Sequence, residues 1–255
     1  MEHIVQIRAL GAAAVIAIGA AVSLITSTVV VSRALKNRGE QSVRAQQELT
    51  VKGLARTRVR SDLGVWGINI SGDGADLQQA YAVLEFGADR VQAFLAEQKF
   101  TEDELALSAI DTTTHFLRDK DGRESQQVVG FSLRRTFTVT SGNVDRIAQA
   151  AGEVTRLLQE NIRVTSSAPE YTYTKVADLK VEILGEASRD ARHRADQIAS
   201  NAGGRTGPVH RAAMGVIQIT RPNSTDVSSY GLYDTSTIEK DVSVVVTMSF
   251  AIESL

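Results

Sequence analysis

Cysteine is absent from this chain, and only 3 of its 255 residues are proline. Without cysteine there is no disulfide framework, no thiolate nucleophile and no zinc–thiolate site to consider. An excess of charge of one sign is lacking too, since 28 Lys and Arg stand against 30 Asp and Glu, for a net charge of −2. Nucleic-acid-binding proteins carry extended basic surfaces. We therefore expect no nucleic acid among the partners of this protein.

Sequence motifs of catalysis and metal binding are also missing. The chain has no G-x-G-x-x-G, P-loop, G-x-S-x-G or H-E-x-x-H pattern. Its four histidines, His3, His115, His193 and His210, are scattered, with no two at a metal-ligand spacing. His115 or His210 could still meet a carboxylate and a serine in space, because triads are recognised by geometry and not by sequence order. We predict no catalytic, cofactor-binding or metal-binding residue, and no cofactor.

Two acidic segments resemble ion-binding loops but have simpler interpretations. Residues 119–124 begin like a calcium loop, yet they lack the third early oxygen ligand and the closing glutamate at its required spacing. A solvated hairpin tip, with Asp121 and Gly122 in the turn, accounts for them. Residues 72–76 hold two glycines and two aspartates, and capping of the next helix by Asp73 or Asp76 explains these residues without a ligand.

The most informative feature that is present is an apolar run at residues 9–31, which contains no charged residue and no proline. As a helix rising about 1.5 Å per residue, this run is long enough to cross a bilayer core of roughly 30 Å. A cleavable signal peptide is the alternative, but its apolar part usually spans only about 7 to 15 residues. Charged residues such as Arg33 and Lys36 also follow the run, where a signal peptidase needs small neutral side chains. We predict an uncleaved transmembrane anchor.

The predicted anchor divides the chain into four parts. Residues 1–8 form an N-terminal tail, residues 9–31 the transmembrane anchor, residues 32–47 a juxtamembrane tether, and residues 48–255 one folded domain. We expect the anchor and the neighbouring cations to contact membrane lipid. Arg8 precedes the span, whereas Arg33, Lys36, Arg38 and Arg44 follow it, so the positive-inside rule by itself would keep the large domain in the cytosol.

Hydrophobic periodicity predicts the elements of the folded domain. Apolar residues recur at three- and four-residue steps in three segments, which we expect to be helices near residues 77–95, 143–160 and 179–202. Alternating patterns predict strands around residues 59–70, 105–116, 126–140, 209–220 and 242–252, the last as a central strand. At Gly64 the alternation of apolar and polar residues shifts by one residue, which suggests a β-bulge. Arg135 falls on an apolar strand face, where we expect a paired or snorkelling guanidinium.

The order of these elements repeats in two halves, residues 57–140 and residues 162–252. Helices packed on one side of a mainly antiparallel sheet define the fold class as α+β. Several segments also resemble the SIMPL-domain family (DUF541), in particular its membrane-anchored bacterial members. The resemblance is carried by residues 49–56, residues 62–66, residues 94–100 with Glu102 and Glu104, and residues 187–195 with Gly203. The chain departs from that pattern in the long Ser/Thr/Asp-rich loop after Pro222.

The resemblance implies two βαββ-like units, a domain that faces the bacterial envelope, and a tendency to form ring-like oligomers. The family has no defined activity, and its members are linked loosely to envelope or oxidative-stress physiology. The function that we expect is therefore that of a non-catalytic envelope protein, a single-pass protein of the inner membrane with its large C-terminal domain in the periplasm. It would act by forming a homo-oligomer or by binding an unknown envelope protein.

The alternative function is that of a small-molecule binding module or a hydrolase, with a site between the two halves. A large apolar pocket with convergent polar groups would favour this alternative. A self-complementary sheet edge would instead favour assembly.

Overall fold

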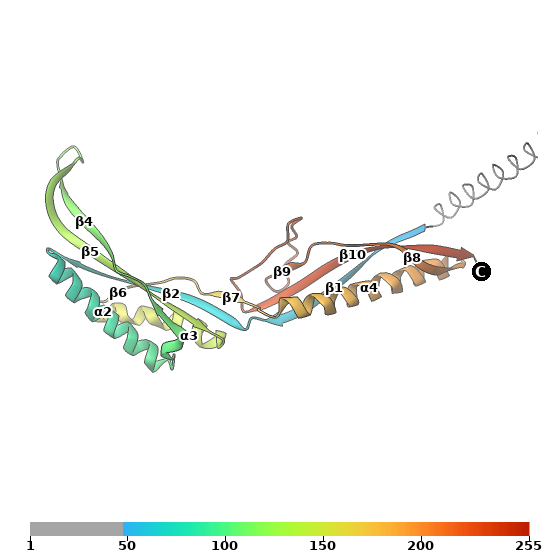
Figure 1. The fold of residues 1–255 in the computed structure, drawn as a ribbon, viewed down its shortest axis with the longest axis horizontal. Coiled ribbons are helices and arrows are strands. Elements are labelled where there is room, and N and C mark those ends of the chain that lie inside the picture. The colour runs from blue at the N-terminus through green and yellow to red at the C-terminus, as the bar shows by residue number, and fades with distance from the viewer. Residues whose placement is uncertain (1–47, 255) are drawn as a thin grey trace, which may run out of the picture. The chain divides into compact units, whose positions relative to one another are not determined.

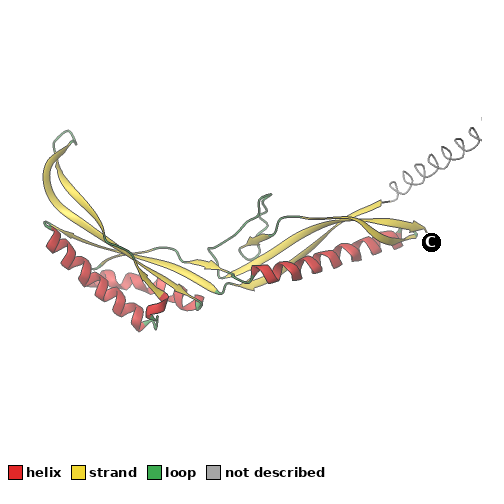
Figure 2. Cartoon of the chain, in the orientation of Figure 1, coloured by secondary structure: helices red, strands yellow, loops and turns green. Residues whose placement is uncertain are grey.

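The computed structural model describes residues 48–254 as an α+β fold with two antiparallel sheets and few helices (Figures 1 and 2). The predicted tail, anchor and tether, residues 1–8, 9–31 and 32–47, lie outside the described residues. In the part of the chain that the structure describes, no helix is long and apolar enough to cross a membrane. The α+β class predicted from periodicity is confirmed.

The larger sheet holds six strands in the order β3-β5-β2-β6, with β4 also paired to β5 and β7 also paired to β2. Its strands are β2 (Leu63–Gly74), β3 (Leu105–Leu107), β4 (Asp111–Arg118), β5 (Glu124–Ser141), β6 (Arg163–Ser166) and β7 (Glu170–Thr172). Helices α2 (Leu77–Glu97) and α3 (Val144–Glu153) pack on one face of this sheet (Figure 1). Short 3-10 helices follow both of them, at Glu102–Glu104 and Val154–Glu160.

Strict alternation along β2 builds the core beneath these helices. Trp66, Ile68 and Ile70 are each at most 1% exposed and pack with Leu84 and Val91 of α2. The last strand residues approach the helix closely, because a Cβ atom at Gly72 would lie 2.5 Å from the carbonyl oxygen of Ala80. Only glycine therefore fits at this position.

The N-terminal caps of the two helices follow from their sequence. The backbone N–H of Gln79 donates to Asp76 Oδ1 at 2.8 Å, which satisfies one of the free donors of the first turn of α2. Asn143 Oδ1 accepts in the same way from the N–H of Arg146 at 3.0 Å at the start of α3. Of the two capping aspartates that the sequence offered, Asp76 is the one used.

The second sheet has the order β1-β10-β8, with β9 also paired to β10. Its strands are β1 (Glu48–Arg60), β8 (Gly204–Met214), β9 (Gln218–Thr220) and β10 (Glu239–Ser254). The long helix α4 (Val176–Asn201) precedes β8 in the chain, and Gly203, with φ +79°, follows the end of this helix. The prediction that the strand around residues 242–252 is central in its sheet is confirmed.

The described residues divide into two compact units. One unit holds residues 48–53, 189–213 and 247–254, and its small core consists of Val51, Ala191, Ala195 and Phe250. The guanidinium of Arg192 lies 5.4 Å from the ring centre of Phe250 in the same unit, a cation–π contact. The other unit holds residues 54–188 and 214–246, with the core that β2, α2 and α3 share.

Four sequence predictions about these elements were wrong in detail. The predicted strand at residues 105–116 is two strands, β3 and β4, separated at residues 108–110. Gly64 is not in a β-bulge, since it pairs in register with Ser141. The alternation of apolar and polar residues shifts there because one strand, β1, ends at Arg60 and another, β2, begins at Leu63. The predicted strand at residues 209–220 is two strands, β8 and β9, separated at residues 215–217. The predicted helix at residues 143–160 is α-helical only to Glu153 and continues as a 3-10 helix.

Candidate functional site

The face of the larger sheet that α2 and α3 leave uncovered is polar, and we call it the open face. Because side chains alternate along a strand, the apolar residues of β2 and β5 point to the helices and their neighbours point away. The open face comprises Asp111, Thr113 and His115 of β4, Ser132, Arg134 and Thr136 of β5, Asn69, Ser71 and Asp73 of β2, and Arg163 and Thr165 of β6. Each of these side chains is half-buried or exposed.

Strand register brings together a histidine, a serine and an aspartate on the open face. His115 Nε2 lies 2.6 Å from Ser132 Oγ, and Ser132 Oγ donates to Asp73 Oδ1 at 2.6 Å. The second carboxylate oxygen of Asp73 forms an ion pair with Arg163. His115 thus meets a serine and, through it, a carboxylate, as the sequence allowed. The His210 side chain on β8 forms no side-chain hydrogen bond in the described part.

The order of these three groups does not suit nucleophilic catalysis. In a catalytic triad the histidine lies between the carboxylate and the serine, so that it can take the serine proton. Here the serine lies in the middle, and its hydroxyl proton is directed to Asp73. The arrangement is a cross-strand polar ladder that joins β4, β5 and β2.

Metal ligands do not gather in the described residues. Residues 48–254 contain no group of three or more His, Asp or Glu side chains that could hold a metal ion. The carboxylate of Asp119, in the segment that resembles a calcium loop, accepts from the N–H groups of Asp121 and Arg123, each at 2.9 Å. Gly122 has φ +79°, as a tight turn requires. The interpretation of residues 119–124 as a hairpin tip is confirmed.

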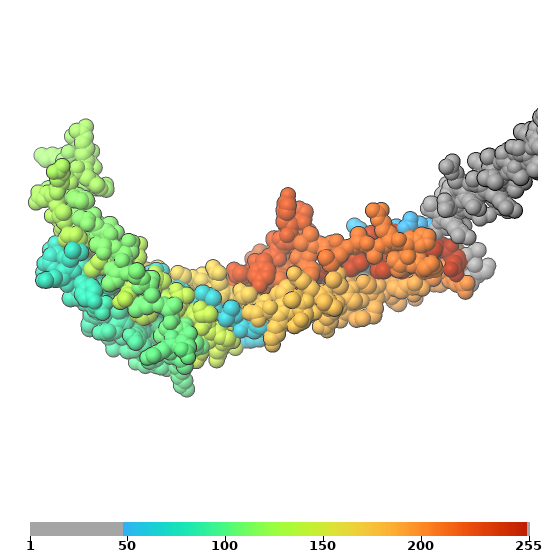
Figure 3. Space-filling model, viewed as in Figure 1, coloured from blue at the N-terminus to red at the C-terminus, as the bar shows by residue number. Residues whose placement is uncertain are grey.

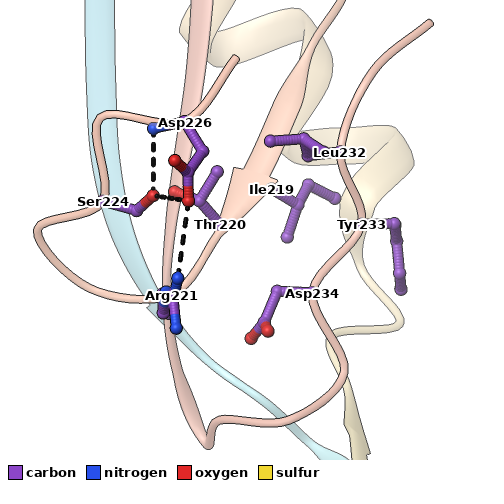
Figure 4. A pocket seen from close by; sticks show the side chains of 8 residues that line it. All are labelled: Ile219, Thr220, Arg221, Ser224, Asp226, Leu232, Tyr233 and Asp234. Atoms are coloured by element: carbon purple, nitrogen blue, oxygen red, sulfur yellow. Dashed lines mark hydrogen bonds and ion pairs between the residues drawn. The ribbon is translucent and has the colours of Figure 1, made fainter. Parts of the chain in front are cut away.

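A polar hollow of about 320 Å³ lies beside the loop that links β9 to β10 (Figure 4). Its lining residues are Ile219, Thr220, Arg221, Ser224, Asp226, Leu232, Tyr233 and Asp234. Asp226 accepts from the Ser224 hydroxyl at 2.8 Å and lies 3.5 Å from the Arg221 guanidinium. These polar groups satisfy one another within the loop, so the hollow presents no set of groups aimed at a ligand.

Asp234, which is half-buried, and Lys240 form an ion pair at the end of this loop. The Lys240 side chain is fully buried, and its Nζ donates to the Thr237 carbonyl at 2.7 Å and lies 3.4 Å from Asp234 Oδ2. Burial raises the pKa of Asp234, but hydrogen bonds from Thr237 and Ser236 and the charge of Lys240 outweigh it and lower the pKa to about 2. Burial lowers the pKa of Lys240 more than the charge of Asp234 raises it. The pair fastens the loop.

An apolar cleft of about 550 Å³ lies between the first turns of α4 and the segment that follows β8. Its lining residues are Val176, Lys180, Leu184, Met214, Gly215, Val216, Ile217, Ile219, Tyr230, Gly231, Leu232 and Tyr233. Lys180 and the hydroxyls of the two tyrosines are the polar side-chain groups of this lining. The cleft is large and apolar, but it lacks the several convergent polar groups that orient a ligand for chemistry.

The hairpin of β4 and β5 continues as two strands past Gly74, the last residue of β2 that pairs with β5, and we call residues 115–129 the arm (Figures 1 and 3). Nearly every residue of the arm is exposed. Phe116 of β4 pairs directly with Val128 of β5, and they are 38% and 43% exposed. Leu117 and Val129 are exposed as well, at 45% and 48%.

Arg135, by contrast, has the structural role that the sequence suggested. Its guanidinium lies 3.3 Å from Glu85 of α2 and donates to the carbonyl of Ser108 at 3.2 Å. The alternation at residues 126–140 could have identified Ser132, Arg134 and Thr136 as one polar face. It could not have identified Asp73 and Arg163, because these residues reach that face only through the pairing of distant strands.

Comparison with known proteins identifies the family but not an activity. No curated protein matches the chain. A solved structure of a candidate aminohydrolase from methicillin-resistant Staphylococcus aureus is 12% identical over 47% of this chain and 31% of its own, with a TM-score of 0.24. A hydrolase from Listeria innocua is 10% identical over 78% of this chain and 92% of its own, with a TM-score of 0.19.

Neither similarity supports an argument about fold or chemistry, and this chain spans about a third of the first of these structures. The model of one family, in contrast, matches residues 49–250, which is most of the chain and includes helices α2, α3 and α4 and most of the central strand β10. The chain therefore belongs to the SIMPL family, which is described as a protein of unknown function (DUF541).

Proposed function

We propose that this protein is a membrane-anchored envelope protein, built from two βαββ-like units, that acts by assembly with other copies of itself or by binding an envelope protein, and not by catalysis. The arm is the observation that carries this proposal. An isolated two-stranded hairpin is at best marginally stable in water. This one also exposes a cross-strand apolar pair, Phe116 and Val128, to solvent. A protein surface placed over the arm would remove this apolar area from water.

The edge of the arm offers a second means of association. Within the described residues, β4 pairs only with β5, so its other edge has no strand partner. An unpaired strand edge is a template on which another chain can add a strand through backbone hydrogen bonds. The same edge on two copies is self-complementary, as a two-fold symmetric dimer requires.

The membrane location rests on the sequence and on the family. The uncharged run at residues 9–31 is long enough to span a bilayer and would bind membrane lipid. The family resemblance supports an inner-membrane protein with residues 48–255 in the periplasm and a link to envelope stress. Arg33, Lys36, Arg38 and Arg44 favour the opposite orientation, although long domains translocate despite such flanking charges.

The assembly proposal is tested with the full chain purified in detergent, by size-exclusion chromatography with light scattering. We expect a molar mass of several protomers for the wild type. Val128→Lys places a charge in the apolar pair of the arm and should shift the protein toward monomer. Gln127→Lys introduces the same charge at the neighbouring exposed residue of the same strand and should leave the mass unchanged. A wild-type monomer that also captures no envelope protein would contradict the proposal.

The apolar cleft supports a second candidate function, the binding of an apolar small molecule. Val216 lines the cleft and is 46% exposed, whereas Val209 lies on β8 outside the lining and is 44% exposed. If the cleft is a binding site, Val216→Lys should abolish the fluorescence gain of an anilinonaphthalene dye, and Val209→Lys should not. Equal dye signals from both variants would exclude the cleft as that site.

A further inference from the structure

The open face contains a shallow hollow of about 340 Å³ that the proposed function does not use. Its lining residues are Asn69, Ile70, Ser71, Arg134 and Thr165, from the three neighbouring strands β5, β2 and β6. Strand register explains why they meet: Arg134 and Arg163 flank Ser71 in one row, and Asn69 and Thr165 are partners in another. The hollow is thus lined by residues of two neighbouring rows, each running across the paired strands of a regular sheet.

Arg134 carries the charge of this hollow. Most arginines of the described part form an ion pair, but Arg134 forms none. Asp111 is its register partner on β4, yet no ion pair joins the two side chains. The nearby carboxylate of Asp73 is occupied by Ser132 and Arg163. The guanidinium donors of Arg134 therefore have no carboxylate within the described residues.

The other polar groups of the hollow are donors as well. The Thr136 hydroxyl donates to Asn69 Oδ1 at 2.7 Å, which fixes the amide and leaves the two N–H donors of its Nδ2 free to meet a ligand. Ser71 and Thr165 add one hydroxyl each. No carboxylate lines the hollow, and each of its polar side chains has an N–H or O–H to donate. This is the donor set that an oxyanion needs.

We propose that this hollow is a binding site for a phosphate group. A phosphate presents three or more acceptor oxygens in three dimensions, which matches donors that come from three strands better than a planar carboxylate does. Arg163 of β6 lies two strands away from Arg134 of β5, with roughly 10 Å between their Cα atoms. It is the neighbour of Ser71 on the side opposite Arg134. The group could belong to free phosphate or to a phospholipid headgroup. The proposal does not depend on assembly through the arm.

The test is calorimetric titration of the full chain in detergent with two soluble probes, inorganic phosphate and glycerophosphoglycerol, a phosphodiester headgroup. We expect saturable binding of at least one probe with a dissociation constant on the order of 1 mM. Arg134→Gln should weaken it about tenfold or more, because it removes a charge-assisted hydrogen bond. Asn69→Asp, which replaces the amide donors by a carboxylate of the same shape, should abolish it.

Two further variants keep the test decisive. Arg123→Gln removes the same charge from the tip of the arm, where Arg123 also forms no ion pair within the described residues, and should bind as the wild type does. Thr165→Val removes one hydroxyl with little change of shape and should weaken binding even if Arg134→Gln proves unstable. Binding of the diester alone would identify a lipid headgroup, and binding of phosphate alone a free anion. No saturable binding, or equal losses in Arg123→Gln and Arg134→Gln, would overturn the proposal.

Discussion

Buried polar residues hold the long connection between β9 and β10 in place. Asp241, whose side chain is 4% exposed, accepts from Arg58 at 2.8 Å and from the N–H of Asn223 at 2.9 Å. Gln218, also buried, donates to the Ser228 carbonyl at 2.7 Å and accepts from the N–H of Leu232 at 2.9 Å. With the Lys240–Asp234 pair, these contacts fix both ends and the middle of a loop that contains little regular structure.

The Asp234 carboxylate should make stability depend on pH in the acid range. Its pKa is about 2 in the folded protein against an ordinary value of 3.8, so the unfolded chain takes up the proton first as the pH falls. The stabilisation, on the order of 2 kcal/mol, is present in full above about pH 4 and is lost toward about pH 2. Urea denaturation at several pH values should show this loss.

The matched variants for this prediction are Asp234→Asn and Asp103→Asn. Asp234→Asn should lower the urea concentration at the midpoint of unfolding at pH 7. Between pH 4 and pH 2, the midpoint of this variant should fall less than that of the wild type. Asp103 is exposed and has no ion pair in the described part, so Asp103→Asn should keep the wild-type profile. A wild-type slope in Asp234→Asn would show that the pair does not fasten the loop.

Two neighbouring valines test the assignment of faces on β10. Val246 is 4% exposed and Val245 is 38% exposed. Val246→Asp buries an unpaired carboxylate, which costs several kcal/mol, comparable with the stability of a domain, and should unfold the unit. Val245→Asp, and likewise Ser243→Asp, should lower the melting temperature far less. Equal melting temperatures for the variants at residues 245 and 246 would contradict the assignment.

At the scale of elements, capping and glycine packing determine where α2 starts and how closely it lies on the sheet. Asp76 supplies the N-terminal cap, while Gly72 and Gly74 let the helix backbone approach the end of β2. Asp73, three residues before Asp76, is instead part of the open face through Ser132 and Arg163. Neighbouring aspartates thus serve a helix and a sheet surface.

The cap makes a measurable contribution to stability. Asp76→Ala removes the acceptor of the Gln79 N–H and should cost about 1 kcal/mol of unfolding free energy, whereas Asp76→Asn should cost only a few tenths. Asp89 is exposed on the same helix and caps nothing, so Asp89→Ala serves as the control and should change stability by less than about 0.5 kcal/mol. Chemical denaturation measures all three variants. Similar losses in Asp76→Ala and Asp89→Ala would argue against the cap.

At the scale of the whole molecule, the proposed anchor would decide where the described units work. A run of this length partitions into hydrocarbon, while the rest of the chain has a balanced polar composition. The full chain should therefore resist alkaline carbonate extraction, and a chain that begins near Gln46 should be released. Extraction of the full chain by carbonate would contradict the anchored arrangement.

Orientation is a separate prediction. If the large domain faces the periplasm, protease added to spheroplasts should digest it while a cytoplasmic marker stays intact. If the domain becomes sensitive to protease only after lysis, it lies in the cytosol, which is the orientation that the flanking charges Arg33, Lys36, Arg38 and Arg44 favour.

Periodicity predicted the long elements well because it is a local property. The apolar residues at three- and four-residue steps from Leu77 to Leu95 predicted helix α2. The alternation of apolar and polar residues from Val242 to Ile252 predicted the central strand β10. The boundary between β1 and β2 was missed, since the Ser61 N–H pairs with the Ile238 carbonyl, 177 residues away in the chain, at 2.9 Å. Contacts of this kind leave no trace in a window of ten residues.

The sequence by itself determined the α+β class, the long helices α2 and α4, the hairpin tip at residues 119–124 and the family, because each depends on short-range pattern or on motifs. Tertiary structure alone decided that β1 joins the sheet of β10, and that Asp73, Ser132 and His115 meet on the open face. It also decided that Arg134 stands beside Asn69 and Thr165 without a carboxylate partner in the described part. The physical reason is the same throughout: strand pairing fixes which distant residues become neighbours, and alternation fixes only the face on which they lie.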